Sequence, residues 1–258
     1  MSSRKKTTLE MTVAAVQLRW GPRALRRLGK DAARPEVPHI PTGFTSLDNA
    51  LGIGGIPRGR ITEILGVPTS GMTTLALKIL ANAQSVGDTA VYVDLAHTFD
   101  PDYAGRCGVN VKRLLLARPH DSRQALDIVY TLVTRGGVGV LLFDAVTDLF
   151  MVARGAWRPI NVLQRLVATL AQSPTVLLFL TPLLFGDATS GEHYPDGFAL
   201  PHVAAVRLLL ERQQWIRRRQ DVRGYRAQVT VLKNRLGASG KRVTIAITFN
   251  GTVQGDAT

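Results

Sequence analysis

One glycine-rich segment, residues 66–74, has the residue types and the spacing of a phosphate-binding loop. Its sequence, Gly-Val-Pro-Thr-Ser-Gly-Met-Thr-Thr, matches the pattern Gly-x-x-x-x-Gly-Lys-Ser/Thr except at a single position. In such a loop the glycines let the backbone approach the ligand closely, and N–H groups at the start of the following helix point at phosphate oxygens. The alternative is a glycine-rich turn between a strand and a helix. The candidate nucleotide-binding residues of the segment are Gly66, Val67, Pro68, Thr69, Ser70, Gly71, Met72, Thr73 and Thr74.

The mismatch falls at Met72, where the pattern requires lysine. That lysine reaches the β- and γ-phosphates, and its charge offsets the negative charge that develops on the transferring phosphoryl group. Methionine carries no charge. We therefore expect weakened nucleotide binding and impaired phosphoryl transfer.

The segments around this loop alternate between short apolar runs and helical periodicity, which predicts an α/β fold. Short apolar runs bounded by glycine, proline or polar residues are typical of buried parallel strands. We expect such strands at Ile61–Leu65, Ala90–Leu95, Leu114–Ala117, Val140–Phe143 and Thr175–Leu180, and amphipathic helices at Thr73–Ser85, Arg123–Arg135 and Pro159–Gln172. Strands that alternate with helices form right-handed βαβ units, so we predict a mainly parallel central sheet flanked by helices.

The two ends of the chain differ from this core. Toward the C-terminus the pattern predicts strands, some of them antiparallel, at Val203–Glu211, Tyr225–Lys233 and Val243–Phe249, with Arg217–Gly224 as a segment that separates the first two. At the other end we expect a basic helix followed by a proline-containing linker. A chain of 258 residues with 45% hydrophobic content can bury one full core. We predict domain boundaries that divide it into residues 1–38, 39–253 and 254–258.

Positive charge is concentrated in two blocks of the sequence. Residues 1–34 contain nine Lys/Arg and two acids, and residues 211–242 contain ten and two, within a net charge of +13. Clustered positive charge indicates a polyanionic partner, most simply nucleic acid. The alternative for any one basic run is a solvated surface. The strongest local candidate interleaves Arg217, Arg218, Arg219, Arg223 and Arg226 with Trp215 and Tyr225.

The sequence has no features of a membrane-spanning or secreted protein. Apolar runs such as 175–185 are too short to cross a bilayer, and the N-terminal Met-Ser-Ser-Arg-Lys-Lys lacks the apolar core of a signal peptide. The single cysteine, Cys107, excludes an internal disulfide framework and a cysteine-rich metal site. We expect a cytoplasmic protein without a membrane partner.

Several longer segments resemble the RecA recombinase family. They are residues 40–64, which begin Ile-Pro-Thr-Gly-Phe-Thr-Ser-Leu-Asp, then Asp100-Pro101-Asp102-Tyr103-Ala104, Leu141–Asp144 and Val231–Arg235, and residues 24–29 resemble the stretch between the family's first helix and its core. Together these segments fall within roughly residues 12–253. The resemblance implies a RecA-like P-loop NTPase core and a role in DNA repair or recombination. It also implies single-stranded DNA as a partner and assembly as a homo-oligomer or within a RecA filament.

The resemblance also implies roles for individual residues outside the loop. Thr73 and Asp144 match the family's Mg²⁺-site residues, and Asp100 and Tyr103 match the positions that hold adenine. Lys233 and Arg235 match basic residues that reach the nucleotide of a neighbouring subunit. Each has a structural alternative: a capping carboxylate for Asp144, a core position for Tyr103, and solvated charges for the two basic residues.

Two departures from the family pattern concern ATP hydrolysis. Ala96 stands where the family has the glutamate that activates the attacking water, so no proton acceptor remains at that position. Thr181-Pro182 stands where the family has Asn-Gln, whose glutamine senses the γ-phosphate and couples it to the DNA loops. His97, beside the missing glutamate, is interpreted as a structural residue rather than as a replacement base. ATP and Mg²⁺ are the implied cofactors, with weakened binding, and we expect ATP turnover close to background.

The family's DNA-facing loops are recognisable in part. The first corresponds to residues 151–158 and offers Arg154, Trp157 and Arg158 for phosphate contact and base stacking. The second corresponds to residues 185–200, which begin with Phe185 and contain no Lys or Arg. Arg217, Arg218 and Arg219 complete the candidate nucleic-acid residues. The alternative for the first loop is a surface loop anchored by its tryptophan.

Two classes of function follow from these observations. The first is a RecA-like repair or recombination protein that binds single-stranded DNA and in which hydrolysis is weak or lost. The second is a non-catalytic accessory protein, similar to the RecA-like subunits of bacterial translesion mutasomes, that binds a repair polymerase or RecA. Retained Asp144, Tyr103 and Lys233 favour the first, because a scaffold needs no nucleotide pocket.

Overall fold

A computed structural model describes residues 2–22, 24–25, 36–146, 159–183, 200–249 and 252–254. The chain divides into two compact units, Met1–Glu36 and Val37–Thr258. Within the described residues, no helix is both long enough and apolar enough to cross a membrane.

The described residues of the first unit consist mainly of one long helix. Helix α1 spans Ser2–Trp20, and the N–H of Gly21 donates to the carbonyl of Gln17 at its C-terminal end. Gly21 has a φ of 92°, a conformation that glycine adopts without steric cost and that commonly ends helices. The predicted N-terminal helix is confirmed, whereas the domain boundary at residue 38 stays a prediction.

The second unit is built on a mixed sheet in which the strand order is β11-β10-β9-β8-β3-β7-β6-β4-β5. Strands β8, β3, β7, β6, β4 and β5 are parallel to one another, and β9, β10 and β11 continue the sheet in antiparallel pairing. The bounds are β3 Ile61–Gly66, β4 Ala90–Asp94, β5 Leu115–Ala117, β6 Val140–Asp144, β7 Val176–Pro182, β8 Val206–Arg218, β9 Asp221–Asn234, β10 Arg242–Phe249 and β11 Val253–Gln254. A separate two-stranded sheet pairs β1 (His39–Ile40) with β2 (Ile56–Pro57).

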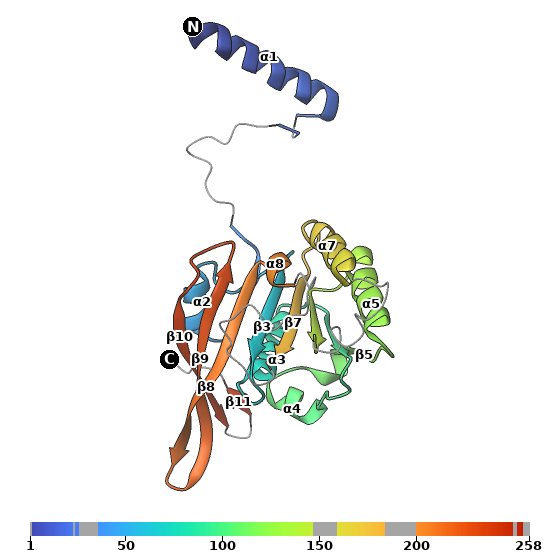
Figure 1. The fold of residues 1–258 in the computed structure, drawn as a ribbon. Coiled ribbons are helices and arrows are strands. Elements are labelled where there is room, and N and C mark those ends of the chain that lie inside the picture. Colours follow the sequence, from blue (N-terminus) through green and yellow to red (C-terminus); the bar gives the residue numbers. More distant parts are fainter. Residues whose placement is uncertain are drawn as a thin grey trace. The chain divides into compact units, whose positions relative to one another are not determined.

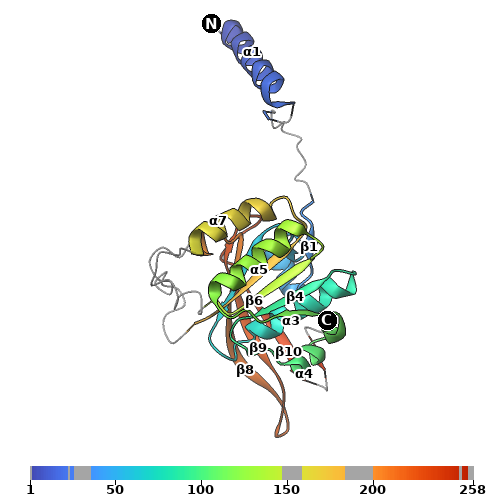
Figure 2. The same ribbon diagram turned by 90° about the vertical axis from the view of Figure 1, so that its right-hand side faces the viewer.

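Helices cover both faces of the central sheet (Figures 1 and 2). On one face, α2 (Thr45–Leu51), α3 (Met72–Ser85) and α4 (Pro101–Arg106) pack on alternate residues of the strands, such as Ile64 and Leu142. On the other face, α5 (Ser122–Arg135), α7 (Pro159–Leu170) and the short α8 (Leu200–Val203) pack on residues such as Leu141 and Phe179. A 3-10 turn, Val111–Arg113, precedes β5. The predicted α/β fold, with a mainly parallel sheet between helices and antiparallel C-terminal strands, is confirmed.

Two details of the C-terminal prediction are wrong. Val203 ends α8 instead of beginning a strand, which starts at Val206. The segment Arg217–Gly224 does not separate two short strands. It forms the end of a long hairpin, in which β8 runs to Arg218 and β9 begins at Asp221. Backbone hydrogen bonds sustain this pairing beyond the core, where the apolar alternation that marks a strand in the sequence is absent.

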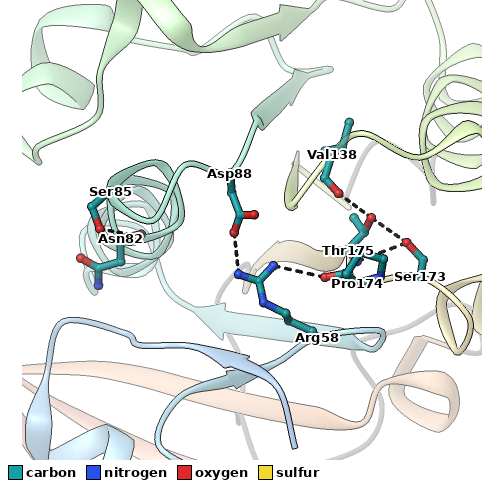
Figure 3. A network of polar contacts seen from close by, with 8 residues as sticks. All are labelled: Arg58, Asn82, Ser85, Asp88, Val138, Ser173, Pro174 and Thr175. Carbon is teal, nitrogen blue, oxygen red and sulfur yellow. Dashed lines mark hydrogen bonds and ion pairs between the residues drawn. The ribbon is translucent and has the colours of Figure 1, made fainter.

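A polar network lies at the edge of the sheet where the parallel strands begin. The Arg58 guanidinium lies 2.5 Å from a carboxylate oxygen of Asp88 and donates a hydrogen bond of 3.3 Å to the carbonyl of Pro174 (Figure 3). Thr175 next to it donates a 2.6 Å hydrogen bond to the carbonyl of Val138. The network therefore links the turns that precede β3, β4, β6 and β7.

We expect Asp88→Ala to lower the free energy of unfolding by about 1–3 kcal/mol, because the substitution removes the charged partner of a guanidinium that is mostly buried. The side chains of Arg58 and Asp88 are only 17% and 23% exposed. The Asp221–Arg223 pair is the matched control, since its side chains are 71% and 52% exposed. Asp221→Ala should cost less than about 1 kcal/mol. Urea denaturation of both variants measures the difference, and equal losses would contradict the assignment.

Candidate nucleotide site and basic hairpin

The candidate phosphate-binding loop, residues 66–74, occupies the carboxyl edge of the sheet, between the end of β3 and the start of α3. The N–H of Ser70 donates to the carbonyl of Val67 at 3.0 Å, and the N–H of Leu75 donates to the carbonyl of Gly71 at 2.9 Å. Gly71 has a φ of 105°, and a Cβ there would lie 2.8 Å from the hydroxyl oxygen of Tyr225. A Cβ at Gly66 would lie 2.6 Å from the carbonyl oxygen of Leu210. Both glycines are therefore required by the geometry of the loop.

A cavity of about 460 Å³ opens beside this loop. Met72 contributes to its wall, although the side chain is only 7% exposed and otherwise packs into the core. The described residues that line it are Pro68, Thr69, Gly71, Met72, Thr73, Thr74, Thr98, Tyr103, Asp144, Pro182, Arg212, Trp215, Tyr225 and Phe249. Its size is in the range of cavities that hold a small organic ligand.

Asp144 lies at the end of β6 and faces the same cavity as Thr73. The hydroxyl of buried Tyr92 donates to the Asp144 carboxylate, and the ring of Phe99 packs edge-on against Tyr92 with centroids 4.7 Å apart. Burial raises the pKa of Tyr92, and the charge of Asp144 adds to the effect. The tyrosine therefore remains a hydrogen-bond donor that orients the carboxylate.

Thr73 and Asp144 fit a site for Mg²⁺ that binds together with a nucleotide. Among the described residues, no three His, Cys, Asp or Glu side chains form a group that could hold a metal ion. Mg²⁺ bound with a nucleotide needs only one or two protein oxygens, because waters and phosphates complete its octahedron. One carboxylate and one hydroxyl in a shared cavity satisfy that requirement.

Asp100 and Tyr103 lie next to the loop, Asp100 as the N-cap residue of α4 and Tyr103 within that helix. The Asp100 carboxylate caps this helix by accepting from the N–H groups of Asp102 and Tyr103 at 2.9 and 3.0 Å. The Tyr103 hydroxyl is 2.6 Å from Oγ1 of Thr74, which is in turn 3.2 Å from the Tyr225 hydroxyl. Burial raises the pKa of Tyr103 to about 12. Asp100 and Tyr103 also line an adjoining cavity of about 290 Å³ that reaches Thr73 and Asp144.

The comparison with known proteins agrees with this arrangement. The family model described as the RecA N-terminal domain matches residues 7–254. The chain belongs to the RecA family. Protein RecA of Symbiobacterium thermophilum is 35% identical, over 95% of this chain and 74% of that protein. Protein RecA of Geobacter sulfurreducens is 36% identical, over 96% and 78%. This membership places the chain among RecA-like recombination and repair proteins.

A crystal structure of the RadB recombinase shares the fold of this RecA-family chain, with a TM-score of 0.63 at 21% sequence identity. The superposition covers 81% of this chain and 96% of that one. At this identity the likeness supports the fold alone.

The turn that carries Ala96 adjoins the cavity beside residues 66–74. Buried Asp94, at the end of β4, accepts from the N–H of Thr98 at 2.8 Å and from Nε of Arg118 at 3.2 Å, and so fixes the turn. Thr98 lines the cavity, whereas Ala96 is exposed and is not among the described lining residues. His97 is exposed with a φ of 55°. The position that lacks the family's glutamate therefore lies two residues from the cavity wall.

The other replaced pair, Thr181-Pro182, ends β7. Oγ1 of Thr181 donates a 2.8 Å hydrogen bond to buried Glu63 on β3, and Arg207 of β8 pairs with the same carboxylate at 2.6 Å. Burial raises the pKa of Glu63, while the Arg207 guanidinium acts in the opposite direction. Thr181 is thus part of the internal structure, and Pro182 contributes only an apolar wall to the cavity.

Lys233 and Arg235 lie near the amino ends of the parallel strands, whereas the loop lies at their carboxyl ends. Nζ of Lys233 donates to the carbonyls of Pro201 and His202 at 2.7 and 2.9 Å, and Arg235 donates to the carbonyl of His202. They are therefore not brought together with this chain's own loop. Their reach toward a neighbouring subunit stays a prediction.

The basic hairpin is the described part of the predicted nucleic-acid surface. Its strands project beyond the rest of the sheet in Figure 1. Arg218 pairs with Asp221, and Arg219 in the turn has a φ of 55°, as two-residue hairpin turns require. Arg217, Arg218, Arg219, Arg223 and Arg226 are all exposed. The other candidates, Arg154, Trp157, Arg158 and Phe185, lie outside the described residues.

Six of the described lining residues were not predicted as part of the nucleotide site: Thr98, Pro182, Arg212, Trp215, Tyr225 and Phe249. The sequence placed Arg212 only within a basic block, and Phe249 only at the end of a strand. The order of the strands in the sheet brings Arg212 and Phe249 to the cavity. Strand β8 lies directly beside β3, which leads into the candidate loop, and β10 lies two strands beyond β8. That order cannot be obtained from residue spacing.

Proposed function

We propose that this RecA-family protein binds single-stranded DNA through the end of the β8–β9 hairpin and binds nucleotide beside residues 66–74 without appreciable hydrolysis. The observation that carries the proposal is the projecting hairpin with five exposed arginines, Arg217, Arg218, Arg219, Arg223 and Arg226. Each guanidinium that contacts a phosphate releases condensed counterions, which makes such a surface a source of affinity. Trp215 is 44% exposed beside them and offers a face for base stacking.

The nucleotide part of the proposal rests on the residues that line the cavity. Backbone N–H groups of Thr69 and of residues 71–73 would hold phosphates, Thr73 and Asp144 would hold Mg²⁺, and Tyr103 would contact the base. Mg²⁺, when bound, would neutralise phosphate charge. Asp144 keeps a fixed orientation because Tyr92 donates to it.

We expect slow hydrolysis because positions 72, 96 and 182 lack the functional groups that the reaction needs. Met72 provides no cation at the loop, and Ala96 provides no proton acceptor for an attacking water. Pro182 has neither a hydrogen-bond donor nor an amide side chain with which to sense a phosphate. Binding and hydrolysis are therefore uncoupled in this protein.

The test is binding of a fluorescently labelled single-stranded oligonucleotide over a range of salt concentrations, with and without ATP and Mg²⁺. We expect the logarithm of the binding constant to fall steeply with the logarithm of salt concentration, by about 0.7 per phosphate contact. Absence of binding at low salt would overturn the proposal. That outcome would instead favour an accessory protein that contacts a repair polymerase or RecA. Assembly with itself or into a RecA filament would be measured in the same samples by light scattering.

A further inference from the structure

A β-bulge interrupts the pairing of β8 with β9 at the mouth of the cavity. Arg212 faces Ala227 and Gln214 faces Arg226, so Gln213 is the extra residue. Residues three apart on a regular strand point to opposite faces. The bulge reverses the alternation, so that Arg212 and Trp215 share the face of Ala227 and Tyr225. Bulges often re-aim side chains beside functional sites.

The re-aimed side chains meet beside the phosphate-binding loop. The Arg212 guanidinium lies over the indole of Trp215, with its central carbon 4.3 Å from the ring centroid. Trp215 packs edge-on against Tyr225, with centroids 5.9 Å apart, and the Tyr225 hydroxyl contacts Thr74 of α3. This stack positions the guanidinium without an acidic partner of its own among the ion pairs of the described residues.

The wall of the cavity carries two opposite charges at separate positions. Among the described residues that line it, Arg212 is the only lysine or arginine and Asp144 the only acid. The two lie on different strands, β8 and β6, which β3 and β7 separate in the sheet. Arg212 comes two residues after Leu210, which pairs with Gly66 at the start of the loop. The Arg212 guanidinium therefore lies next to the loop, in which Met72 stands at the position of the usual lysine.

We propose that Arg212, held on Trp215 by the bulge, supplies the positive charge that binds the phosphates of a nucleotide in this cavity in place of the missing loop lysine. The inference rests on the nucleotide part of the proposed function. A guanidinium offers several N–H donors in a fixed plane and remains charged at any physiological pH. Stacking on the indole limits its rotamers, which reduces the entropy lost when it binds an anion.

The test compares adenosine, ADP and ATP, each with Mg²⁺, by calorimetric titration of the full chain. We expect Arg212→Gln to weaken ADP and ATP binding by about 10- to 100-fold, the effect of one charge-assisted hydrogen-bonding group. Adenosine binding should be unchanged, because it has no phosphate. Arg242→Gln is the matched control: an exposed arginine on β10 that does not line the cavity, for which all three affinities should stay the same.

A second variant separates the charge from the packing of the side chain. Met72→Lys in the Arg212→Gln background should recover most of the lost ADP and ATP affinity, because it returns a cation to the loop. Equal losses for adenosine and ATP would overturn the inference, since they would indicate a packing role. Unchanged ATP affinity in Arg212→Gln would overturn it while the proposed function stands. If the unsubstituted protein binds none of the three compounds, the nucleotide part of the proposed function fails and the inference fails with it.

Discussion

Replacement of Arg217, Arg218 and Arg219 by glutamine is expected to weaken binding to a single-stranded oligonucleotide about 100-fold at about 0.1 M salt. Each phosphate contact contributes about 0.7 to the slope of log K against log salt concentration, so three contacts contribute about 2. The slope should therefore become shallower by about 2, and the difference in affinity should disappear as the salt concentration approaches about 1 M. Fluorescence anisotropy at several salt concentrations measures both quantities.

A matched variant distinguishes a binding surface from net charge. Arg106, Arg113 and Arg123 are also exposed, and they lie on α4, the 3-10 turn and α5 instead of on the hairpin. Their joint replacement by glutamine removes the same charge and should change the affinity by less than about 5-fold, since only long-range attraction is lost. Equal losses in the two triple variants would show that the hairpin has no special role.

The double variant Met72→Lys, Ala96→Glu is expected to increase ATP turnover in the presence of DNA by at least about 100-fold. A positioned general base contributes about 10²–10⁴-fold, and a preorganised charge at the phosphoryl group about 10²–10³-fold. Lysine can occupy position 72 because its methylene stem can follow the buried path of Met72 while the ammonium enters the cavity. Pro182 remains, so we expect only part of the family's activity to return. Phosphate release measures the gain.

The control for this gain is the double variant Met72→Leu, Ala96→Gln, in which glutamine matches the size of glutamate and leucine repacks position 72. Neither replacement adds a charge or a general base, so turnover should remain at the level of the unsubstituted chain. A gain in the control variant equal to that in the Met72→Lys, Ala96→Glu variant would mean that packing, and not the chemistry of the two positions, limits the reaction.

The core of the fold could be predicted from the sequence because buried strands and helices have characteristic patterns of apolar residues. Strands β3, β4, β6 and β7 are covered on both faces, so they appear as apolar runs, and their predicted bounds agree with the structure to within two residues. The α3 and α5 helices carry regular apolar stripes for the same reason. The position of the phosphate-binding loop between β3 and α3 followed from these elements.

The hairpin and the wall of the cavity could not be predicted in the same way. Arg217 and Arg218 are strand residues because their backbones pair with β9, a property that an exposed polar side chain does not reveal. The bulge at Gln213 decides which face Arg212 occupies, and nothing in the order of residues marks it. Short α8 likewise replaces the start of a predicted strand, because four residues carry too little periodicity to distinguish a helical turn from a strand.

Phosphate release by the unsubstituted chain, with ATP, Mg²⁺ and saturating single-stranded DNA, is the most informative single measurement. We propose that the chain retains the phosphate-binding frame and lacks the groups that drive hydrolysis. Release should match a protein-free control within error, with RecA of Geobacter sulfurreducens as the positive control in the same assay. Turnover comparable to that RecA would contradict the account, since residues 72 and 96 would then not be needed for hydrolysis.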